Sequence, residues 1–380
     1  MKQKKFVFLL LLSLSLMGFE QKKTADQQVE QKINELISKM SIEEKVGQMA
    51  QFTLDVLGKG GGLYASDEPF ELDPAMMDVV FGKYKVGSIL NTSNNRARTT
   101  EVWENIITNI QQKAIKETGI PVLYGIDSNH GTTYTAGGTL FPQEIGMAAT
   151  FNPQLVEKGS QISAYETRAS NIPWTFNPTM DLGRDARWSR QWESYGEDAY
   201  LNATMAVASV RGFQGKDRNS VGKNQIAACI KHYMGYGVPV SGKDRTPAVI
   251  SESDLREKFF EPFRASIVDG GALSLMVNSG IINGVSTHSD YRLITEWLKE
   301  DLNFDGVIVT DWADVQNLLS RDHIAKDYRD AIRIAINAGI DMVMEPYNLK
   351  FCDELVALVK SGEVKQTRID DAVRRILRMK

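Results

Sequence analysis

The sequence predicts a (β/α)₈ barrel with insertions, and three features of the chain support this fold class. Short apolar runs alternate with helical patterns, which is typical of parallel strands joined by right-handed crossovers. Eight such strand–helix units fit into the roughly 340 residues that follow the N-terminal segment. Hydrophobic residues make up 42% and charged residues 24% of the 380 residues, as in ordinary soluble globular domains.

The elements of this barrel can be placed along the chain. The predicted strands are Val46–Phe52, Val86–Leu90, Val122–Asp127, Pro173–Asp181, Ile226–Tyr233, Leu273–Ser279, Gly306–Asp311 and Asp341–Glu345. The predicted helices are Asn105–Glu117, Pro153–Ala169, Asp198–Phe213, Glu252–Val268, Tyr291–Leu302, Tyr328–Ala338 and Asp353–Lys360. Two helix starts carry capping signals: Ser41–Glu44 reads S-x-x-E, and Asn152 precedes a proline. A doubly wound open sheet is the alternative, but the glycines of Gly58–Tyr64 lack the G-x-G-x-x-G spacing of its phosphate-binding turn.

The N-terminus has the pattern of an export signal. A basic start, MKQKK, precedes the apolar run Phe6–Phe19, which is short for a membrane span and suits a signal peptide. We expect a signal peptide over residues 1–22, a flexible lead-in over residues 23–30 and the barrel domain over residues 31–380. An uncleaved membrane anchor is the alternative. The predicted location is outside a bacterial cytoplasm, in the periplasm or the medium, with no membrane attachment after cleavage.

Composition argues against several kinds of partner. The formal net charge is −4 and the isoelectric point about 5.8, without a basic patch, so nucleic acid is not an expected partner. Cys229 and Cys352 lie far apart in the sequence and lack metal-ligand spacing, which favours two unpaired buried thiols. We predict no metal site and no cofactor.

Polar side chains stand at the ends of six predicted strands. They are Asp127, Asp181, Lys231–His232, Asn278–Ser279, Asp311–Trp312 and Glu345, with Asn129–His130 just after the first. Because the C-terminal ends of barrel strands meet at one mouth, we expect these side chains to form one polar cluster. Acids, a lysine, a histidine and an indole suit a sugar ring, and glycoside cleavage usually needs two carboxyl groups. A carboxylate held by nearby cations would stay ionised and available to attack an anomeric carbon.

The same residues also allow other interpretations. Asp311 can be the N-cap of a helix that follows a buried strand, and Lys231 with His232 can be a solvated strand end. An aldolase or another lyase-type barrel, with Lys231 as a Schiff-base lysine, fits the bare pattern too. A sugar-binding protein that does not cleave its ligand is a further alternative.

Five motifs follow one another along the chain. They read TLFPQEIGMAATFNP (Thr139–Pro153), DARWSRQWESYGEDAYL (Asp185–Leu201), IKHYMGYG (Ile230–Gly237), INGVSTHSDYRLITEWLKEDLNFDGVIVTDW (Ile282–Trp312) and RIDDAVRRILRMK (Arg368–Lys380). Together they resemble the N-terminal domain of glycoside hydrolase family 3, and most closely its β-glucosidase branch, over about residues 31–380. The resemblance implies a retaining hydrolase whose catalytic nucleophile is Asp311. It also implies removal of terminal non-reducing β-D-glucosyl residues, with a β-xylosidase of the same family as the alternative.

By the same resemblance, six further residues should bind the sugar. Those expected in the first subsite are Asp127, Arg190, Lys231 and His232, with Trp312 in the apolar wall and Arg245 as a looser match. From the residues alone, Arg190 can instead pair with Glu193 or Asp198, and Trp312 can belong to the core. The resemblance gives Asp181 and Glu345 no catalytic role, and it leaves His130 and Asn278 undecided. The expected substrate is a β-linked gluco-oligosaccharide or an aryl β-glucoside.

Two departures from the family pattern bear on function. Many relatives carry a tyrosine where this chain has Ser279, so a hydrogen bond to the nucleophile is missing or comes from elsewhere. The β-glucosidase branch takes its general acid, a glutamate, from a second α/β sandwich domain, which we expect to be absent here. The loop Val238–Ser251, which holds a catalytic histidine in the other branch, contains none. We therefore expect the acid to come from a missing C-terminal domain or a second chain; a catalytically crippled fragment or a carbohydrate-binding remnant is the alternative.

Overall fold

The structure, a computed structural model, describes residues 26–60 and 65–380. The chain divides into two compact units, Met1–Ser41 and Ile42–Lys380. In the first unit residues 26–39 form a helix. Residues 26–30, expected to belong to a flexible lead-in, are therefore helical, because the residues that follow them are rich in good helix formers. The predicted signal peptide lies outside the described residues. Among the helices that the structure describes, none is long and apolar enough to cross a membrane.

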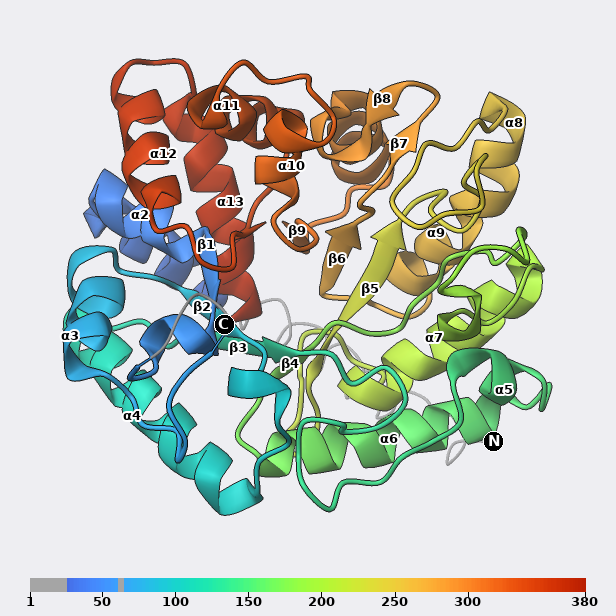
Figure 1. The fold of residues 1–380 in the computed structure, drawn as a ribbon, viewed down its shortest axis with the longest axis horizontal. Coiled ribbons are helices and arrows are strands. Elements are labelled where there is room, and N and C mark those ends of the chain that lie inside the picture. Colours follow the sequence, from blue (N-terminus) through green and yellow to red (C-terminus); the bar gives the residue numbers. More distant parts are fainter. Residues whose placement is uncertain (1–25, 61–64) are drawn as a thin grey trace, which may run out of the picture. The chain divides into compact units, whose positions relative to one another are not determined.

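Eight parallel strands form the central sheet of the second unit (Figure 1). In spatial order they are β10 (Val343–Met344), β1 (Ala50–Thr53), β2 (Ser88–Leu90), β3 (Leu123–Ile126), β4 (Trp174–Thr175), β5 (Ala227–Tyr233), β6 (Ser274–Val277) and β9 (Val307–Val309). A parallel bridge between Val309 and Met342 brings the two ends of this order together, so the sheet is a nearly closed barrel. The predicted barrel fold is confirmed, and the doubly wound open sheet is wrong.

Helices connect the strands and lie outside them, as Figure 1 shows for α4, α6 and α7. The α-helices are α2 (Ile42–Gln48), α3 (Pro74–Met77), α4 (Thr100–Thr118), α5 (Glu144–Ala148), α6 (Pro153–Ala169), α7 (Ala199–Gln214), α8 (Glu252–Asp254), α9 (Glu261–Val268), α10 (Asp314–Ser320), α11 (Tyr328–Ala338), α12 (Lys350–Lys360) and α13 (Gln366–Met379). Short 3₁₀ helices are η1 (Leu54–Leu57), η3 (Ser93–Asn95), η4 (Gln191–Glu193) and η6 (Thr287–Ser289), and π-helical segments are η2 (Asp78–Lys83), η5 (Leu255–Phe259) and η7 (Arg292–Asp301). A small antiparallel hairpin joins β7 (Ile281–Ile282) to β8 (Val285–Ser286).

Local sequence signals account for several helix boundaries. The bounds of α6 and α11 are the predicted ones, and the Asn152 side chain caps α6 by accepting hydrogen bonds from the backbone N–H groups of Gln154 and Leu155. The predicted helix Glu252–Val268 is interrupted by the π-helical segment η5, just before Pro262. A proline cannot donate a backbone hydrogen bond, so the regular ladder cannot continue through it.

Two predicted strands are wrong in extent. The predicted strand Val46–Phe52 begins too early, because its residues up to Gln48 belong to helix α2. The S-x-x-E signal starts that helix at Ile42. The predicted strand Pro173–Asp181 shrinks to Trp174–Thr175, since Pro178 has no N–H group for the ladder. The chain beyond that strand still runs alongside β5, through a bridge from Thr179.

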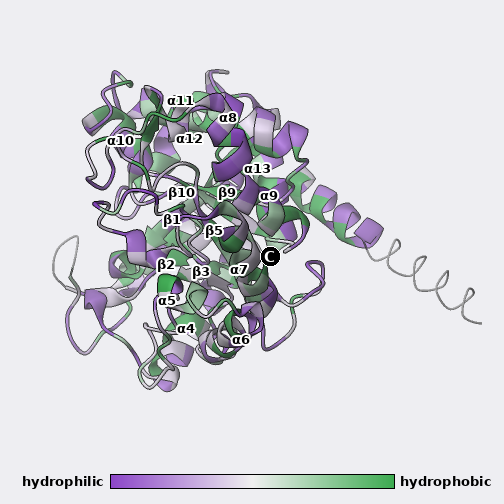
Figure 2. Ribbon diagram, turned by 90° about the vertical axis from the view of Figure 1, so that its right-hand side faces the viewer, coloured by the Kyte–Doolittle hydropathy of each residue, from purple (hydrophilic) through white to green (hydrophobic). Residues whose placement is uncertain are grey.

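The core lies inside the barrel and between the strands and the helices. Figure 2 shows hydrophobic residues concentrated where β2, β3 and β5 lie, and hydrophilic residues on outer helices and loops. Large aromatic side chains such as Phe52, Tyr124 and Trp174 are fully buried, and each contributes substantial apolar area. Because parallel strands all end on the same side, this packing fixes the residues after β3, β5 and β9 around one opening.

Candidate active site

A cavity of about 490 Å³ lies at the C-terminal ends of the barrel strands, within the size range of small-molecule sites. Its lining includes all seven residues that the sequence predicts for the site: Asp127, Arg190, Lys231, His232, Arg245, Asp311 and Trp312. Asp127 directly follows β3, Lys231 and His232 lie among the last three residues of β5, and Asp311 lies two residues after β9. Other polar residues at predicted strand ends, Asp181, Asn278, Ser279 and Glu345, do not line this cavity.

Asp311 presents one free carboxylate oxygen to this cavity. Its Oδ1 accepts a hydrogen bond from the backbone N–H of Trp312 at 2.6 Å, and its own backbone N–H donates to His288 Nε2 at 3.3 Å. The Oδ2 atom is buried and has no hydrogen-bond partner in the described part of the chain. Two nitrogen atoms, His232 Nε2 and Arg245 Nη2, each lie 3.9 Å from it. An oxygen that is fixed, desolvated and unbonded has the environment that a nucleophile needs.

The structural alternatives for the strand ends are wrong. Helix α10 begins at Asp314 with Ala313 at its N-cap position, so Asp311 is not a helix cap. Lys231 and His232 are each only 2% exposed, so they are not a solvated strand end. Both side chains line the cavity instead.

Lys231 forms an ion pair with Asp127 across the barrel mouth. Its Nζ atom lies 2.6 Å from Asp127 Oδ1, and the side chain of Asp127 is 36% exposed. The pair joins the end of β5 to the end of β3 and leaves the remaining donors and acceptors of both groups for a ligand. Paired charges of this kind suit vicinal hydroxyl groups, whereas a Schiff-base lysine needs an amine whose lone pair is free.

Arg190 both forms an ion pair with Glu193 and lines the cavity. Its Nε and Nη2 donate to the two carboxylate oxygens of Glu193 at 2.9 and 2.7 Å, which is a bidentate ion pair. The same Nη2 lies 3.3 Å from His232 Nε2, and the guanidinium stands over the ring of Tyr236 at 5.6 Å. Glu193 thus fixes the plane of Arg190, while Arg190 remains part of the cavity wall. The proposed pairing with Asp198 does not occur, because Asp198 caps α7.

His232 is held as a neutral imidazole. Its Nδ1 lies 2.8 Å from Asp181 Oδ2, and because the Arg190 guanidinium can only donate, Nε2 accepts and Nδ1 carries the proton. Burial, reinforced by the positive charges of Arg190, Lys231 and Arg245, lowers the pKa of His232 well below its usual value. The ring is therefore uncharged, has both nitrogens occupied by Asp181 and Arg190, and does not act as an acid at neutral pH. Asp181, predicted to be structural, orients this ring.

The apolar side of the cavity contains Trp312. Its ring is half-buried and meets the ring of Tyr347 edge to face, with centroids 5.9 Å apart. Phe176, Met276 and Met344 complete this side of the lining. A half-buried indole beside hydroxyl-binding groups is a surface on which a sugar ring can stack.

Ser279 does not hydrogen-bond to Asp311. Its hydroxyl accepts from Arg245 Nη1 at 3.0 Å and donates to Asp314 Oδ1 at 2.8 Å. The cation nearest to Asp311 on this side is Arg245 itself. A hydrogen bond from this side to Asp311 Oδ2 is therefore missing among the described residues, and the Arg245 guanidinium lies 3.9 Å from that oxygen.

Four further polar residues of the cavity were not predicted as site residues: Asn91, Asn129, Glu193 and Asp244. Glu193 lies in the motif that contains Arg190, Asp244 immediately precedes Arg245, and Asn91 immediately follows β2. Asp244 accepts a hydrogen bond from Trp188 Nε1 at 3.0 Å. The expectation that polar residues at strand ends face the site applies to Asn91 as it does to Asp127 and Asp311. Glu193 and Asp244 lie outside the strands, where no sequence pattern indicates which residues face the cavity. No three His, Cys, Asp or Glu side chains of the described chain are grouped as metal ligands would be.

Two residues that the sequence left undecided have structural contacts. Asn278 donates from its side chain to the backbone carbonyl of Met234 and accepts from the Gly280 N–H, which shapes the turn after β6. The His130 ring is placed within 3.3 Å of the backbone carbonyl of Phe141, and the residue does not line the main cavity. Neither contact involves Asp311.

Glu345 directly follows strand β10 and is buried, and it accepts a hydrogen bond from the Tyr328 hydroxyl at 2.9 Å. Burial raises the pKa of Glu345 to about 7 from the ordinary value of 4.5, against the opposing effect of the hydrogen bond from Tyr328. Because the folded pKa exceeds the unfolded one, the stability contributed by the protonated carboxyl is complete below pH 4.5 and is lost as the pH rises through 7. The neutral form is thus the one that suits this site.

We therefore expect Glu345→Gln to raise the free energy of unfolding at pH 8 by up to about 3 kcal/mol, with the difference vanishing near pH 4.5. Denaturant unfolding at both pH values measures it, and Glu296→Gln at an exposed position is the matched control. Equal stabilities of Glu345→Gln and the unchanged chain at pH 8 would contradict the structural role, as would a large loss of activity.

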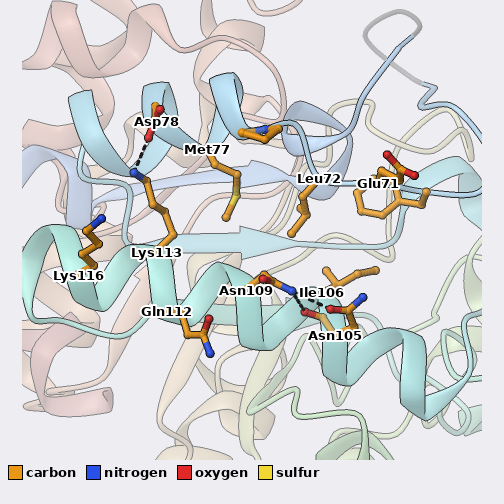
Figure 3. Close-up of a pocket in the computed structure, with 12 residues that line it drawn as sticks. Glu71, Leu72, Met77, Asp78, Asn105, Ile106, Asn109, Gln112, Lys113 and Lys116 are labelled. Atoms are coloured by element: carbon orange, nitrogen blue, oxygen red, sulfur yellow. Dashed lines mark hydrogen bonds and ion pairs between the residues drawn. The ribbon is translucent and has the colours of Figure 1, made fainter.

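A second cavity, of about 590 Å³, lies on the outer side of the barrel between α3, η2 and α4 (Figure 3). Figure 3 shows Asp78 and Lys113 paired across it, above the amide side chains of Asn105 and Asn109. None of its lining residues stands at the C-terminal end of a barrel strand. None of the seven residues that the sequence predicts for the site lines this second cavity.

Comparison with known proteins agrees with the fold and with the motifs. The family model described as "Glycosyl hydrolase family 3 N terminal domain" matches residues 41–379. A lysosomal beta glucosidase of Dictyostelium discoideum is 39% identical over 92% of this chain and 43% of its own length. A putative beta-xylosidase of Formosa agariphila is 32% identical over 99% of this chain and 50% of its own length.

The solved structures include a β-glucosidase from Erythrobacter marinus, with a TM-score of 0.84 and 28% identity over 92% of this chain and 45% of that one. The chain thus spans half or less of the length of these relatives. Since the family model covers almost every residue after the first unit, one assignment follows. This chain belongs to glycosyl hydrolase family 3 and carries its N-terminal domain.

Proposed function

We propose that this chain is the barrel domain of a retaining β-glycosidase, and specifically of a β-glucosidase that removes terminal non-reducing β-D-glucosyl residues through a covalent bond to Asp311. The observation that carries this proposal is Asp311 Oδ2, which is buried, has no hydrogen-bond partner among the described residues and faces the cavity beside two nitrogen atoms. The names of the β-glucosidase relatives support the choice of sugar.

The chemistry has two steps. In the first, Oδ2 attacks the anomeric carbon, the bond to the leaving oxygen breaks, and that oxygen takes up a proton. In the second, a water oxygen attacks the same carbon, its proton is lost, and the electron pair of the ester bond returns to Asp311. Two displacements at one carbon retain the β configuration.

The other predicted residues have a binding role in this proposal. Lys231 and Asp127 form one pair of hydroxyl-binding charges, and Arg190 with His232 forms a second group beside it. Trp312 supports the face of the ring. Hydrogen bonds between charged groups and sugar hydroxyls are stronger than neutral ones, so they can hold the anomeric carbon against Oδ2.

We propose further that the general acid comes from outside this chain, from another domain or from a second polypeptide. The other carboxylates that line the cavity each accept from a fixed donor: Asp127 from Lys231, Glu193 from Arg190, and Asp244 from Trp188. A carboxylate bound to a fixed donor is a poor proton source for a leaving group. His232 is also unsuitable, because its pKa lies well below neutral.

The stereochemistry of the first product tests the proposed mechanism. We expect proton NMR of a reaction with dinitrophenyl β-glucoside to show the β-anomer of glucose before the α-anomer appears by mutarotation. The α-anomer as the first product would contradict a glycosyl–Asp311 intermediate. Saturable binding of the glucoside without any product would instead favour the carbohydrate-binding remnant.

The sugar can be tested by the same assay. We expect a larger kcat/KM for dinitrophenyl β-glucoside than for the corresponding xyloside, which lacks the hydroxymethyl group. The specific reason to include the xyloside is the Formosa agariphila relative, whose name is putative beta-xylosidase. A larger kcat/KM for the xyloside would indicate that the chain belongs to a β-xylosidase instead of a β-glucosidase.

The dependence of rate on the leaving group tests the origin of the acid. For this chain alone, we expect alkyl β-glucosides to lose the contribution of about 10²–10⁴-fold that general acid catalysis supplies, while dinitrophenyl β-glucoside loses little. A series of aryl β-glucosides should therefore give a rate of glycosylation that falls steeply as the leaving-group pKa rises. A flat dependence would show that the proton donor lies within the chain.

A further inference from the structure

Arg245 directs three nitrogen atoms at three different oxygen atoms. Its Nη1 donates to Ser279 Oγ at 3.0 Å, its Nε lies 3.5 Å from Asp244 Oδ2, and its Nη2 lies 3.9 Å from Asp311 Oδ2. The side chain is 36% exposed, so it reaches the nucleophile from the open side of the cavity. A planar guanidinium held at two positions has little freedom at the third, which fixes the direction of Nη2.

Of these three contacts of Arg245, the hydrogen bond to Ser279 is the shortest, and Ser279 is fully buried. Besides accepting from Arg245, its hydroxyl accepts from Arg321 Nη1 at 3.1 Å and donates to Asp314 Oδ1 at 2.8 Å. One donor and two acceptor positions are all that a hydroxyl has, so the group is saturated. Asp314 is itself fully buried and fixed by Asn317 Nδ2 at 2.7 Å.

We infer that Ser279 is a positioning residue, which holds Arg245 so that the guanidinium faces the nucleophilic oxygen of Asp311. This inference rests on the proposed glycosidase function. It adds to that function the residue that holds the positive charge of Arg245 beside Oδ2. Ser279 itself does not hydrogen-bond to Asp311 and acts through Arg245.

The role has a kinetic consequence for one step. When the glycosyl–Asp311 bond breaks, its electron pair returns to Oδ2, water oxygen bonds to the anomeric carbon, and the water proton is lost. A fixed cation beside Oδ2 stabilises the carboxylate that forms, so Arg245 favours this deglycosylation step over the first. If Arg245 no longer faces Oδ2, deglycosylation should slow and the covalent intermediate should accumulate.

The test is a comparison of Ser279→Ala with the unchanged chain on dinitrophenyl β-glucoside, whose good leaving group makes deglycosylation rate-limiting. We expect kcat to fall about tenfold, the usual effect of losing a hydrogen bond to a charged group. KM should fall with it, so that kcat/KM changes by less than about twofold. The matched control is Ser286→Ala, because the buried Ser286 hydroxyl has no hydrogen-bond partner within the described residues.

A double-mutant cycle separates positioning from a general structural role. If Ser279 acts through Arg245, then Ser279→Ala should cost nothing further in an Arg245→Met background. A second tenfold loss in that background would overturn the inference, as would an unchanged kcat for Ser279→Ala alone. The variant should fold, because Asp314 keeps its bonds to Asn317 and Arg321.

A crystal structure of Ser279→Ala distinguishes failure of the inference from failure of the proposed function. If the unchanged chain shows no turnover, the glycosidase proposal fails, but the position of Arg245 can still be observed. The inference predicts that the Arg245 guanidinium leaves its place beside Asp311 Oδ2. An unchanged distance between Nη2 and Oδ2 overturns it.

Discussion

Replacing Asp311 by Asn should lower kcat/KM for an activated aryl β-glucoside by about 10⁴-fold or more, in line with removal of nucleophiles from other covalent enzymes. The Asn side chain keeps the size of the residue and the acceptor for the Trp312 N–H, so the loss reports the missing charge and nucleophile rather than a collapsed site. Steady-state kinetics measure the effect. Asp301→Asn at an exposed position is the matched control and should behave as the unchanged chain does.

A smaller variant at the same position gives a second readout. Asp311→Ala leaves space beside Arg245 and His232 in which azide can attack the anomeric carbon. We expect azide to restore turnover of dinitrophenyl β-glucoside and to give the α-glucosyl azide, because a single displacement inverts the configuration. If Asp311→Asn keeps activity within tenfold of the unchanged chain, Asp311 is not the nucleophile.

Lys231→Met should be the next most damaging change, with an expected loss of about 10²–10³-fold in kcat/KM. Methionine fills most of the same space but removes the ammonium that lies 2.6 Å from Asp127 Oδ1 and borders the cavity. Binding energy from hydroxyl groups is used to align the anomeric carbon, so kcat should fall along with affinity. Kinetics on the glucoside and denaturant unfolding, run together, separate lost binding from lost stability.

The matched control for this change is Lys216→Met, at an exposed position outside the cavity. Asp127 is partly exposed, so leaving it without its partner should cost little stability compared with a fully buried charge. If the activity of Lys231→Met falls only in proportion to the fraction of protein that is folded, the ion pair is structural. The sugar-binding role of Lys231 would then be wrong.

The architecture could be predicted from the sequence because its signals are local. Each strand is a short apolar run, and a parallel barrel brings the ends of all its strands to one side. That rule places Asp127, Lys231 and Asp311 at the same end of the barrel. The family resemblance added Arg190, which lies on the 3₁₀-flanked loop after β4 and not at a strand end.

What could not be predicted depends on contacts between distant segments. Ser279 looks like any serine at a strand end, and its role becomes visible only when Arg245 and Asp314 are both seen on its hydroxyl. The neutral state of His232 depends on burial and on Arg190, which no spacing in the sequence reports. The start of β1 was misplaced because helix α2 ends at Gln48 and the strand begins at Ala50, with a single residue between them.

The central claim is that Asp311 forms a covalent glycosyl-enzyme within this chain. Intact-mass spectrometry after exposure to an activated 2-deoxy-2-fluoro-β-glucoside tests it most directly, because the leaving group needs little protonation and the fluorine slows release of the sugar. The account predicts a mass gain of one fluorosugar, mapped by peptide digestion to Asp311 and absent in Asp311→Asn. A folded chain that gains no mass, or that gains it at another residue, would contradict the account.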